Sequence, residues 1–420
     1  MVHIVIHRMF SLSVSLPVRG ADGLAKRAIY GGVERQRLSS QSIKAHLRAG
    51  TGLNSPMADL AKELGTEMSV RSAIIGARRI ATELANRGLA EDIASTWGNE
   101  VMALFQSGKA KPAAKPAKKG KNGKVDADEA DADAQDQQDE AAPTDVPGRQ
   151  ILTLGVKEIA ALTKVAETLQ KAKVDPSEMR ELVEKATKRK KQPKEVQDAL
   201  EALDAVRSHA GFDGALFGRM ATGIALSRVD SAVHVGHALT THPIQSSVDF
   251  FSAQDQLLDR DAGETGGAHI GSRELTTGVF YLPVVIDVEQ VRKNFAGSVG
   301  EFEGWTNKEI AKIAGWLVKA VATVTPAAML GSTAPFPDPG EIVVEITTGQ
   351  PVNAMGAFEQ PVAPTLSASV AAFDRHMERV WAMIGRPADV VSLSDFIDPK
   401  AATPAVQRLA DAVADAIERK

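Results

Sequence analysis

The segment from Gly31 to Arg48, GGVERQRLSSQSIKAHLR, most constrains how this chain can fold. Its two glycines allow the backbone to turn and to approach a ligand closely. Arg35 and Arg37 are separated by one residue, so an extended backbone places both side chains on the same face. Ser39 or Ser40 can then cap a helix. The segment therefore predicts a turn, an extended stretch and a capped helix in succession.

The predicted helix has two different faces. Ile43 and Leu47 are four residues apart and form an apolar stripe. Gln41, Lys44 and Arg48 share the neighbouring face. The amides at a helix N-terminus, the helix dipole, hydroxyl groups and cations together form a site for a polyanion. A capped helix on a solvated surface explains the same residues, so both interpretations stay open at this point.

Composition excludes several other kinds of site. The chain has 420 residues, of which 44% are hydrophobic, so it can form a large core and two or three structural units. A net charge of -4 provides no overall basic field, so any nucleic-acid site must be local. The absence of cysteine excludes disulfides, thiolate catalysis and thiolate metal sites. Without a spanning apolar run or a secretory leader, we expect a cytoplasmic protein that makes no membrane contact.

Hydrophobic patterns divide the chain into segments. Alternation predicts a strand at 2–14, and glycines with the cations Arg19 and Lys26 predict a ligand-binding loop at 16–30. Helical spacing recurs from 57 to 106 and from 149 to 210. Between them, 107–148 is a lysine-rich run followed by an aspartate-rich run, which cannot bury enough apolar surface to fold. We therefore predict a disordered, low-complexity insertion there.

Two further strands are predicted at 230–242 and 278–288, and we expect them to be neighbours in a sheet. The connection between them is much longer than a hairpin needs, and long ordered loops are usually functional. It contains Phe250 and Phe251 among polar residues. We therefore predict a protruding arm at about 243–273 whose aromatic tip contacts a partner or a base.

Catalytic and metal-binding motifs give little support to an enzyme. Many of the histidines fall in the segments described above, but no His-Glu-x-x-His motif, Walker motif, nucleophile elbow or dinucleotide fingerprint occurs. We therefore expect no metal, no cofactor and no catalytic residue. Asp249 and Asp255 could instead cut RNA as an acid and a metal ligand, and this alternative remains open.

Three separated motifs resemble one known family. They are Gly-Gly-x-x-Arg-x-Arg-x-Ser-Ser-Gln-Ser-x-Lys at 31–44, Gly-Arg-Met at 218–220, and Val-Asp-x-Ala-x-x-Val-x-His-Ala-x-Thr-Thr-His ending at His242. In this order they are similar to the CasC backbone subunits of type I-E Cascade CRISPR complexes. The similarity continues through 267–271 and 277–281, and it covers most of the chain outside 107–148.

The resemblance implies an α+β fold shaped like a right hand. Its palm would be a modified RNA-recognition-motif (ferredoxin-like) sheet, formed by 1–56 and 211–420 and including the thumb at about 243–273. Its fingers would be the helices of 57–106 and 149–210. The ordinary RNA-recognition motif has stacking aromatics that this chain lacks, which agrees with binding of an RNA backbone rather than bases.

The implied function is that of a non-catalytic subunit that binds the backbone of guide RNA (crRNA). Copies would stack into a helical filament along the spacer, together with other Cascade subunits, and would leave the intervening bases free to pair with target DNA in antiviral defence. The alternative is a guide-dependent target-RNA endoribonuclease that uses a loop aspartate, as in type III complexes, with Asp249 in that role.

The resemblance also assigns individual residues. Guide-phosphate contacts are implied for Arg19, Lys26, Ser40, Gln41, Lys44 and Arg48, to which the strand pattern adds Arg35 and Arg37. Met220 matches a side chain that wedges at a kink in the RNA. Phe251 matches the thumb aromatic that displaces a base.

Overall fold

The computed structural model describes residues 1–50, 56–72, 74–103, 151–178, 211–219, 228–254, 267–296, 306–326 and 330–419. The predicted insertion at 107–148 lies outside these residues, and so does the segment 179–210. Within the described residues, no helix is both long and apolar enough to cross a bilayer.

Helices and strands are interspersed along the chain, and the fold is α+β, as the sequence predicts. The strands are β1 (His3–Ser15), β2 (Arg27–Tyr30), β3 (Val33–Leu38), β4 (Val70–Ser72), β5 (Leu152–Leu154), β6 (Val233–Val235), β7 (Ala238–Thr240), β8 (Gln245–Gln254), β9 (Gly267–Asp287), β10 (Glu341–Thr347) and β11 (Asp389–Ser392). The α-helices are α1 (Ser40–Ala49), α2 (Pro56–Glu63), α3 (Ile75–Asn86), α4 (Glu91–Ala103), α5 (Val156–Lys171), α8 (Gly211–Phe217), α9 (Val288–Ala296), α10 (Asn307–Thr323), α11 (Leu330–Thr333), α12 (Leu366–Ile384) and α13 (Ala405–Glu418). Short 3₁₀ helices are η1 (Pro176–Glu178), η4 (Ala354–Phe358) and η5 (Leu393–Phe396).

The chain divides into two compact units. The first consists of Met1–Pro56, His234–Ile286 and Ala311–Lys420, and the second of Met57–Val233 and Asp287–Ile310. The second unit therefore includes 211–233 and 287–310, which the sequence assigned to the palm. Within this unit, α8 packs against α9, α5 and β5.

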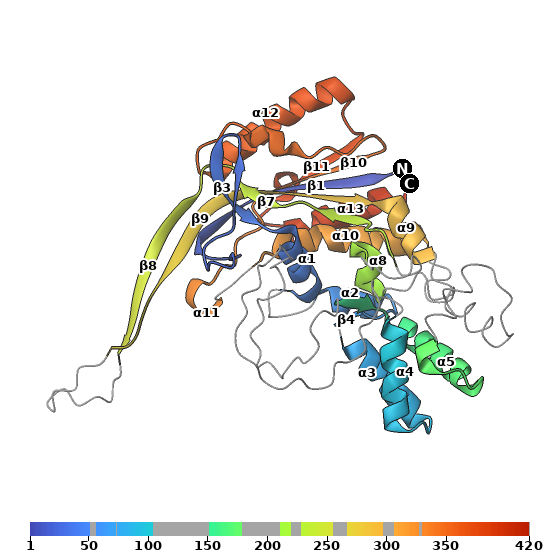
Figure 1. The fold of residues 1–420 in the computed structure, drawn as a ribbon. Coiled ribbons are helices and arrows are strands. Elements are labelled where there is room, and N and C mark those ends of the chain that lie inside the picture. Colours follow the sequence, from blue (N-terminus) through green and yellow to red (C-terminus); the bar gives the residue numbers. More distant parts are fainter. Residues whose placement is uncertain are drawn as a thin grey trace, which may run out of the picture. The chain divides into compact units, whose positions relative to one another are not determined.

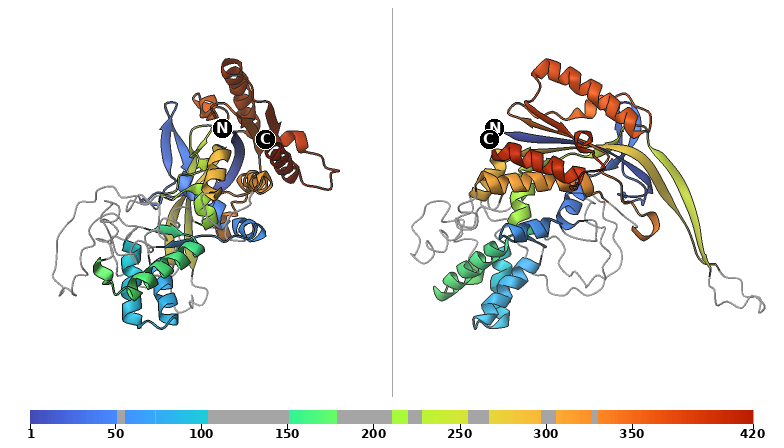
Figure 2. Two further views of the ribbon diagram at one scale, coloured as in Figure 1. Left: turned by 90° about the vertical axis from the view of Figure 1, so that its right-hand side faces the viewer. Right: turned by 180° about the vertical axis from the view of Figure 1, so that it is seen from behind.

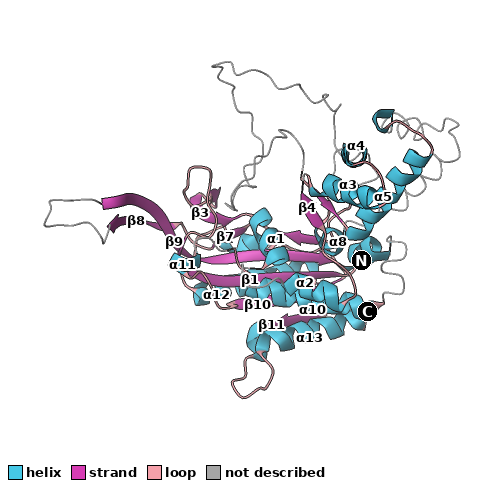
Figure 3. Ribbon diagram, turned by 90° about the horizontal axis from the view of Figure 1, so that it is seen from below, coloured by secondary structure: helices cyan, strands magenta, loops and turns pink. Residues whose placement is uncertain are grey.

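The first unit is built on one large sheet. Its strands follow the order β11, β10, β1, β9, β7, β3 and β2, and β6 and β8 also pair with β9. Figure 3 shows this sheet from below. The central strand β1 is antiparallel to β10, with Ile6 opposite Val344. Strand β7 pairs with β9 through Leu239 and Tyr281, which confirms that the predicted strands at 230–242 and 278–288 are neighbours.

Helices cover both faces of this sheet. Figure 1 shows α12 on one face, and α10 and α13 on the other. Successive residues of β1 point to opposite faces because the strand period is two. Met9 packs in a buried cluster with Phe373 and Met377 of α12, whereas Arg8 points to the other side and donates to the Val321 carbonyl of α10 at 2.8 Å.

Arg8 is a cation that lies fully buried in β1. Its guanidinium also donates to the carbonyl oxygens of Val324, Asp338 and Pro339 and to the Thr325 hydroxyl. Burial lowers the pKa of Arg8 to about 9, and the nearby Asp338 raises it again in part. The side chain therefore pairs carbonyl groups at the C-terminus of α10, which a helix leaves without intrahelical partners.

Strands β8 and β9 extend beyond the sheet as a long antiparallel hairpin (Figures 1 and 2). Their register runs from Gln245 opposite Thr277 to Gln254 opposite Gly267. This hairpin, called the arm below, corresponds to the protruding segment that the sequence predicts at about 243–273. The residues 255–266 at its end lie outside the described part of the chain.

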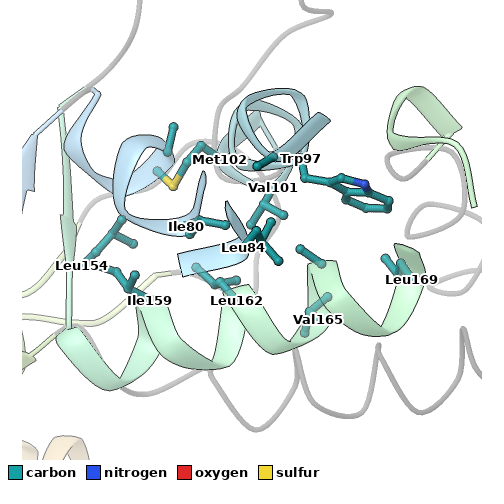
Figure 4. Close-up of a cluster of buried hydrophobic side chains, with 13 residues drawn as sticks. Ile80, Leu84, Trp97, Val101, Met102, Leu154, Ile159, Leu162, Val165 and Leu169 are labelled. Carbon is teal, nitrogen blue, oxygen red and sulfur yellow. The ribbon is translucent and has the colours of Figure 1, made fainter. Parts of the chain in front are cut away.

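The second unit has a core of its own. Helices α3, α4 and α5 bury a cluster of apolar side chains around Ile80, Trp97 and Leu162 (Figure 4). Near it, Arg219 lies 2.7 Å from Glu158, and both side chains are almost fully buried. Glu158 also accepts the Gly155 backbone N–H at the start of α5. This ion pair and its hydrogen bonds connect α5 to the segment that follows α8.

Candidate nucleic-acid interface

Helix α1 has the architecture that the sequence predicts. Ser39 is the N-cap, and its side chain accepts a hydrogen bond from the Ser42 backbone N–H at 3.4 Å. Ile43 and Leu47 are buried on the inner face. A serine N-cap fixes where the helix begins, because it pairs an amide that the helix itself leaves free. The first turn of α1 is thereby held at the end of β3, next to the basic face of α1.

Lys44 and Arg48 are half-buried neighbours on that basic face. Burial lowers the pKa of Lys44, and the positive charge of Arg48 lowers it further. Both influences disfavour the charged ammonium, and no carboxylate is among the groups that shift its pKa. A bound anion would counteract both effects, since an opposite charge at close range favours the ionised form. The pair therefore favours a negatively charged ligand.

His237 joins this surface from a distant part of the chain. Its Nδ1 accepts the Ser40 backbone N–H at 3.0 Å. Burial lowers the pKa of His237, and the positive charges of Arg37 and Lys26 lower it further. The structure thus brings Lys26, Arg37 and His237 together at the N-terminus of α1. We call this group, with Ser40, Gln41, Lys44 and Arg48, the basic surface.

Arg19 and Lys26 lie in the connection between β1 and β2. This connection folds back on itself through a bridge between Arg19 and Ala25, and the Lys26 carbonyl accepts the Arg37 backbone N–H at 2.8 Å. Lys26 is thereby fixed beside β3, and Arg19 is exposed. Part of the glycine-bearing loop that the sequence predicts therefore folds as a short hairpin.

Arg35 does not belong to the basic surface, contrary to the prediction from its spacing. The side chain is fully buried, and its guanidinium donates to the carbonyl oxygens of Tyr30, Thr240 and Phe358 at 3.0, 2.7 and 2.6 Å. Arg37, two residues further along the same face of β3, is only partly buried. The packing of η4 over one position and not the other separates the two arginines.

Gly31 and Gly32 also have a structural role. They form the two-residue turn between β2 and β3, with φ angles of 63° and 77° that favour glycine. A Cβ atom on Gly31 would lie 1.7 Å from the Glu359 carbonyl oxygen. The close approach that glycine permits at Gly31 is therefore to the chain's own backbone.

The arm presents its two aromatic residues differently. Phe251 lies against Gly271, where a Cβ would be 2.6 Å from the ring, and the Arg273 guanidinium stacks over it at 5.2 Å from the ring centroid. Arg273 also pairs with Asp249 at 3.0 Å. Phe250 points to the opposite face of β8 and is 68% exposed. The exposed aromatic of the described arm is thus Phe250.

Met220 lies outside the described residues, and no position is assigned to it. The residue before it, Arg219, is described: its backbone forms an antiparallel bridge with Val229. Gly218, with a φ angle of 77°, packs tightly against Val229 and Ser231. Arg219 and Val229 therefore both lie in the second unit.

The buried histidines form hydrogen bonds within the core. His7 Nδ1 lies 2.7 Å from the Tyr281 hydroxyl, and His242 contacts the Pro243 carbonyl through Nδ1 and accepts the Val279 N–H through Nε2. Over the residues that the structure describes, no group of three or more histidines and carboxylates could hold a metal ion. His237 is the site residue that sequence reasoning did not assign, because its partner Ser40 is 197 residues away.

The first unit is thus an α+β sheet with a basic surface at one helix N-terminus and a long antiparallel arm. A family model described as CT1975-like protein matches residues 4–416. The chain belongs to the family of CT1975-like proteins.

Two solved structures share this fold. One is described as "CRISPR RNA-guided surveillance complex, pre-nicking"; its chain has a TM-score of 0.67 and 22% identity, with 99% of this chain and 100% of that chain covered. Another, described as "CRISPR RNA-guided surveillance complex", has a TM-score of 0.57 and 20% identity, with 99% of each chain covered. No curated protein matches the sequence.

Proposed function

We propose that this protein is a subunit of a CRISPR surveillance complex and binds the backbone of its guide RNA (crRNA). It would be a subunit of the same type as the CasC subunits of type I-E Cascade. Copies of it would form a filament along the spacer in the cytoplasm. Other Cascade subunits and target DNA would be its further partners. The support is the fold shared over 99% of the chain with components of such complexes, together with the basic surface.

The observation that carries the proposal is the state of Lys44. A half-buried lysine whose pKa is lowered by burial and by Arg48 is poorly suited to an unliganded surface. It is well suited to binding a polyanion whose phosphates repeat along a backbone, such as single-stranded RNA. No phenylalanine, tyrosine or tryptophan is among the residues that define the basic surface, which fits a guide that must be held whatever its sequence.

We propose a non-catalytic role. The alternative, cleavage of target RNA by Asp249, requires a free carboxylate on the arm. In the structure, Asp249 forms an ion pair with Arg273 and lies in a β-ladder position opposite it. This pairing favours a structural role for Asp249 in holding the two strands together.

Charge reversal of two residues tests the proposal. The double variant Lys44→Glu, Arg48→Glu should lose guide RNA when the protein is expressed with its neighbouring genes and purified, because two attractive contacts become repulsive. The matched control is Arg375→Glu, Arg379→Glu, which changes the charge equally at two exposed positions of α12. Copurifying RNA is measured by its length distribution and absorbance. A Lys44/Arg48 variant that retains as much RNA as the control contradicts the proposal.

A further inference from the structure

His237 makes an unusual contact with α1. Its Nδ1 accepts the backbone N–H of Ser40, the first residue of the helix, at 3.0 Å. This amide has no acceptor within the helix, because the first amides of a helix precede any carbonyl that could accept them. The N-cap Ser39 serves Ser42 instead. An imidazole from the segment between β6 and β7 therefore caps this amide of α1.

The contact requires a neutral imidazole in one tautomer. To accept from Ser40, Nδ1 must be unprotonated, so the ring proton is on Nε2. The charged groups that act on His237 are Arg37 of β3 and Lys26 of the preceding connection, and both are cations. The positive end of the α1 dipole faces the ring as well. All of these groups favour the neutral ring, in agreement with the geometry.

We propose that His237 is a positioning residue of the basic surface. Its neutral imidazole holds the first turn of α1 at the place where Ser40, Gln41 and Lys44 meet the RNA backbone. This inference rests on the proposed function, and it names a residue that fixes the position of α1 within the basic surface. Protonation of Nδ1 replaces an acceptor by a second donor, which releases the Ser40 amide and loosens the turn.

RNA affinity therefore carries a specific dependence on pH. The imidazole is neutral above its lowered pKa, and the contact is lost as the pH falls through that value. Added positive charge on other groups strengthens RNA binding in acid and must be separated from this effect. The separation is possible by comparing His237 with a residue that cannot be protonated.

Two substitutions distinguish positioning from direct contact. In His237→Asn, the side-chain oxygen can occupy the place of Nδ1 and accept from Ser40, whereas in His237→Gln the amide reaches the place of Nε2. We would measure binding of a fluorescein-labelled single-stranded RNA to the full chain at constant salt, from about pH 8 down to the lowest pH at which the protein stays folded. Thermal unfolding of each variant shows whether it is folded.

Positioning predicts that at high pH His237→Asn binds as the wild type does, while His237→Gln binds about fivefold more weakly, the effect of one hydrogen bond. In acid, the RNA affinity of the wild type should fall by about fivefold relative to that of His237→Asn. The reverse order of the two variants, or equal binding by all three proteins at every pH, overturns the inference. Loss of RNA in Lys44→Glu, Arg48→Glu alongside equal binding by the His237 variants would leave the proposed function standing and remove this inference alone.

Discussion

Lys44 shows how a single residue can be suited to a ligand and unsuited to the free protein. Its ammonium is half-buried one helical turn from Arg48, and like charges at this spacing destabilise a helix by about 0.2–0.5 kcal/mol. Burial adds to that penalty, and both appear as a lowered pKa. An RNA phosphate would remove the repulsion.

Lys44→Met should separate these two effects. Because methionine keeps the aliphatic stem without the charge, we expect the free energy of unfolding at neutral pH to stay the same or rise by about 0.5 kcal/mol. The slope of log K against log salt for RNA binding should fall by about 0.7, as expected for one lost phosphate contact on a single strand. Chemical denaturation and salt titrations measure the two quantities.

The sign of the pH dependence provides a control for Lys44→Met. The folded-state pKa of Lys44 is lowered below the ordinary value of 10.5, so the penalty is complete below the lowered pKa and disappears as the pH rises towards 10.5. Any gain in stability should therefore shrink in alkali. A variant that is less stable by more than about 1 kcal/mol, with an unchanged salt slope, would mean that Lys44 only packs.

At the scale of an element, the arm is a two-stranded ribbon with different faces. One face holds the two strands together through Phe251, Gly271 and Arg273. The other presents Val248 and Phe250, which are 75% and 68% exposed. A hairpin that extends beyond a sheet depends on such cross-strand pairs.

Alanine substitutions of the two phenylalanines should have different effects. Phe251→Ala removes a cross-strand contact, so amide hydrogen exchange in β8 and β9 should become faster. Phe250→Ala should leave exchange unchanged and weaken RNA binding by about tenfold, as expected for the loss of one stacked base. If Phe251→Ala weakens binding without faster exchange, then Phe251 contacts the base, as the resemblance implies.

At the scale of the whole molecule, two units contain separate cores. The first is centred on the large sheet and its buried aromatics, and the second on the cluster around Ile80, Trp97 and Leu162. In the second unit the buried pair Arg219 and Glu158 joins α5 to the end of α8. Breaking a buried pair is far more destabilising than its formation is stabilising, because one charge remains in the core.

Glu158→Gln should therefore affect one unit selectively. We expect a loss of about 3 kcal/mol in the stability of the second unit, since the Arg219 charge loses its carboxylate. Hydrogen exchange measured by mass spectrometry should become faster in α5 and α8, while β1 and β10 of the first unit keep their protection. Exchange that rises equally throughout the chain would show that the two units unfold together.

The sequence by itself determined the features that depend on local spacing. A serine cap at the start of α1, the buried stripe of Ile43 and Leu47, and the strand predicted at 2–14 and observed at 3–15 follow from hydrogen-bonding groups and periodicity within a few residues. The arm could be predicted because its length exceeds what a turn requires.

Only the tertiary structure decided which polar groups are used for packing and which face solvent. Arg35 and Arg37 have equivalent positions in the strand pattern, but the carbonyls of Thr240 and Phe358 surround one and not the other. His237 meets Ser40 across 197 residues. Burial depends on what packs over a side chain, and the segments that do so are distant in sequence, so no local pattern contains that information.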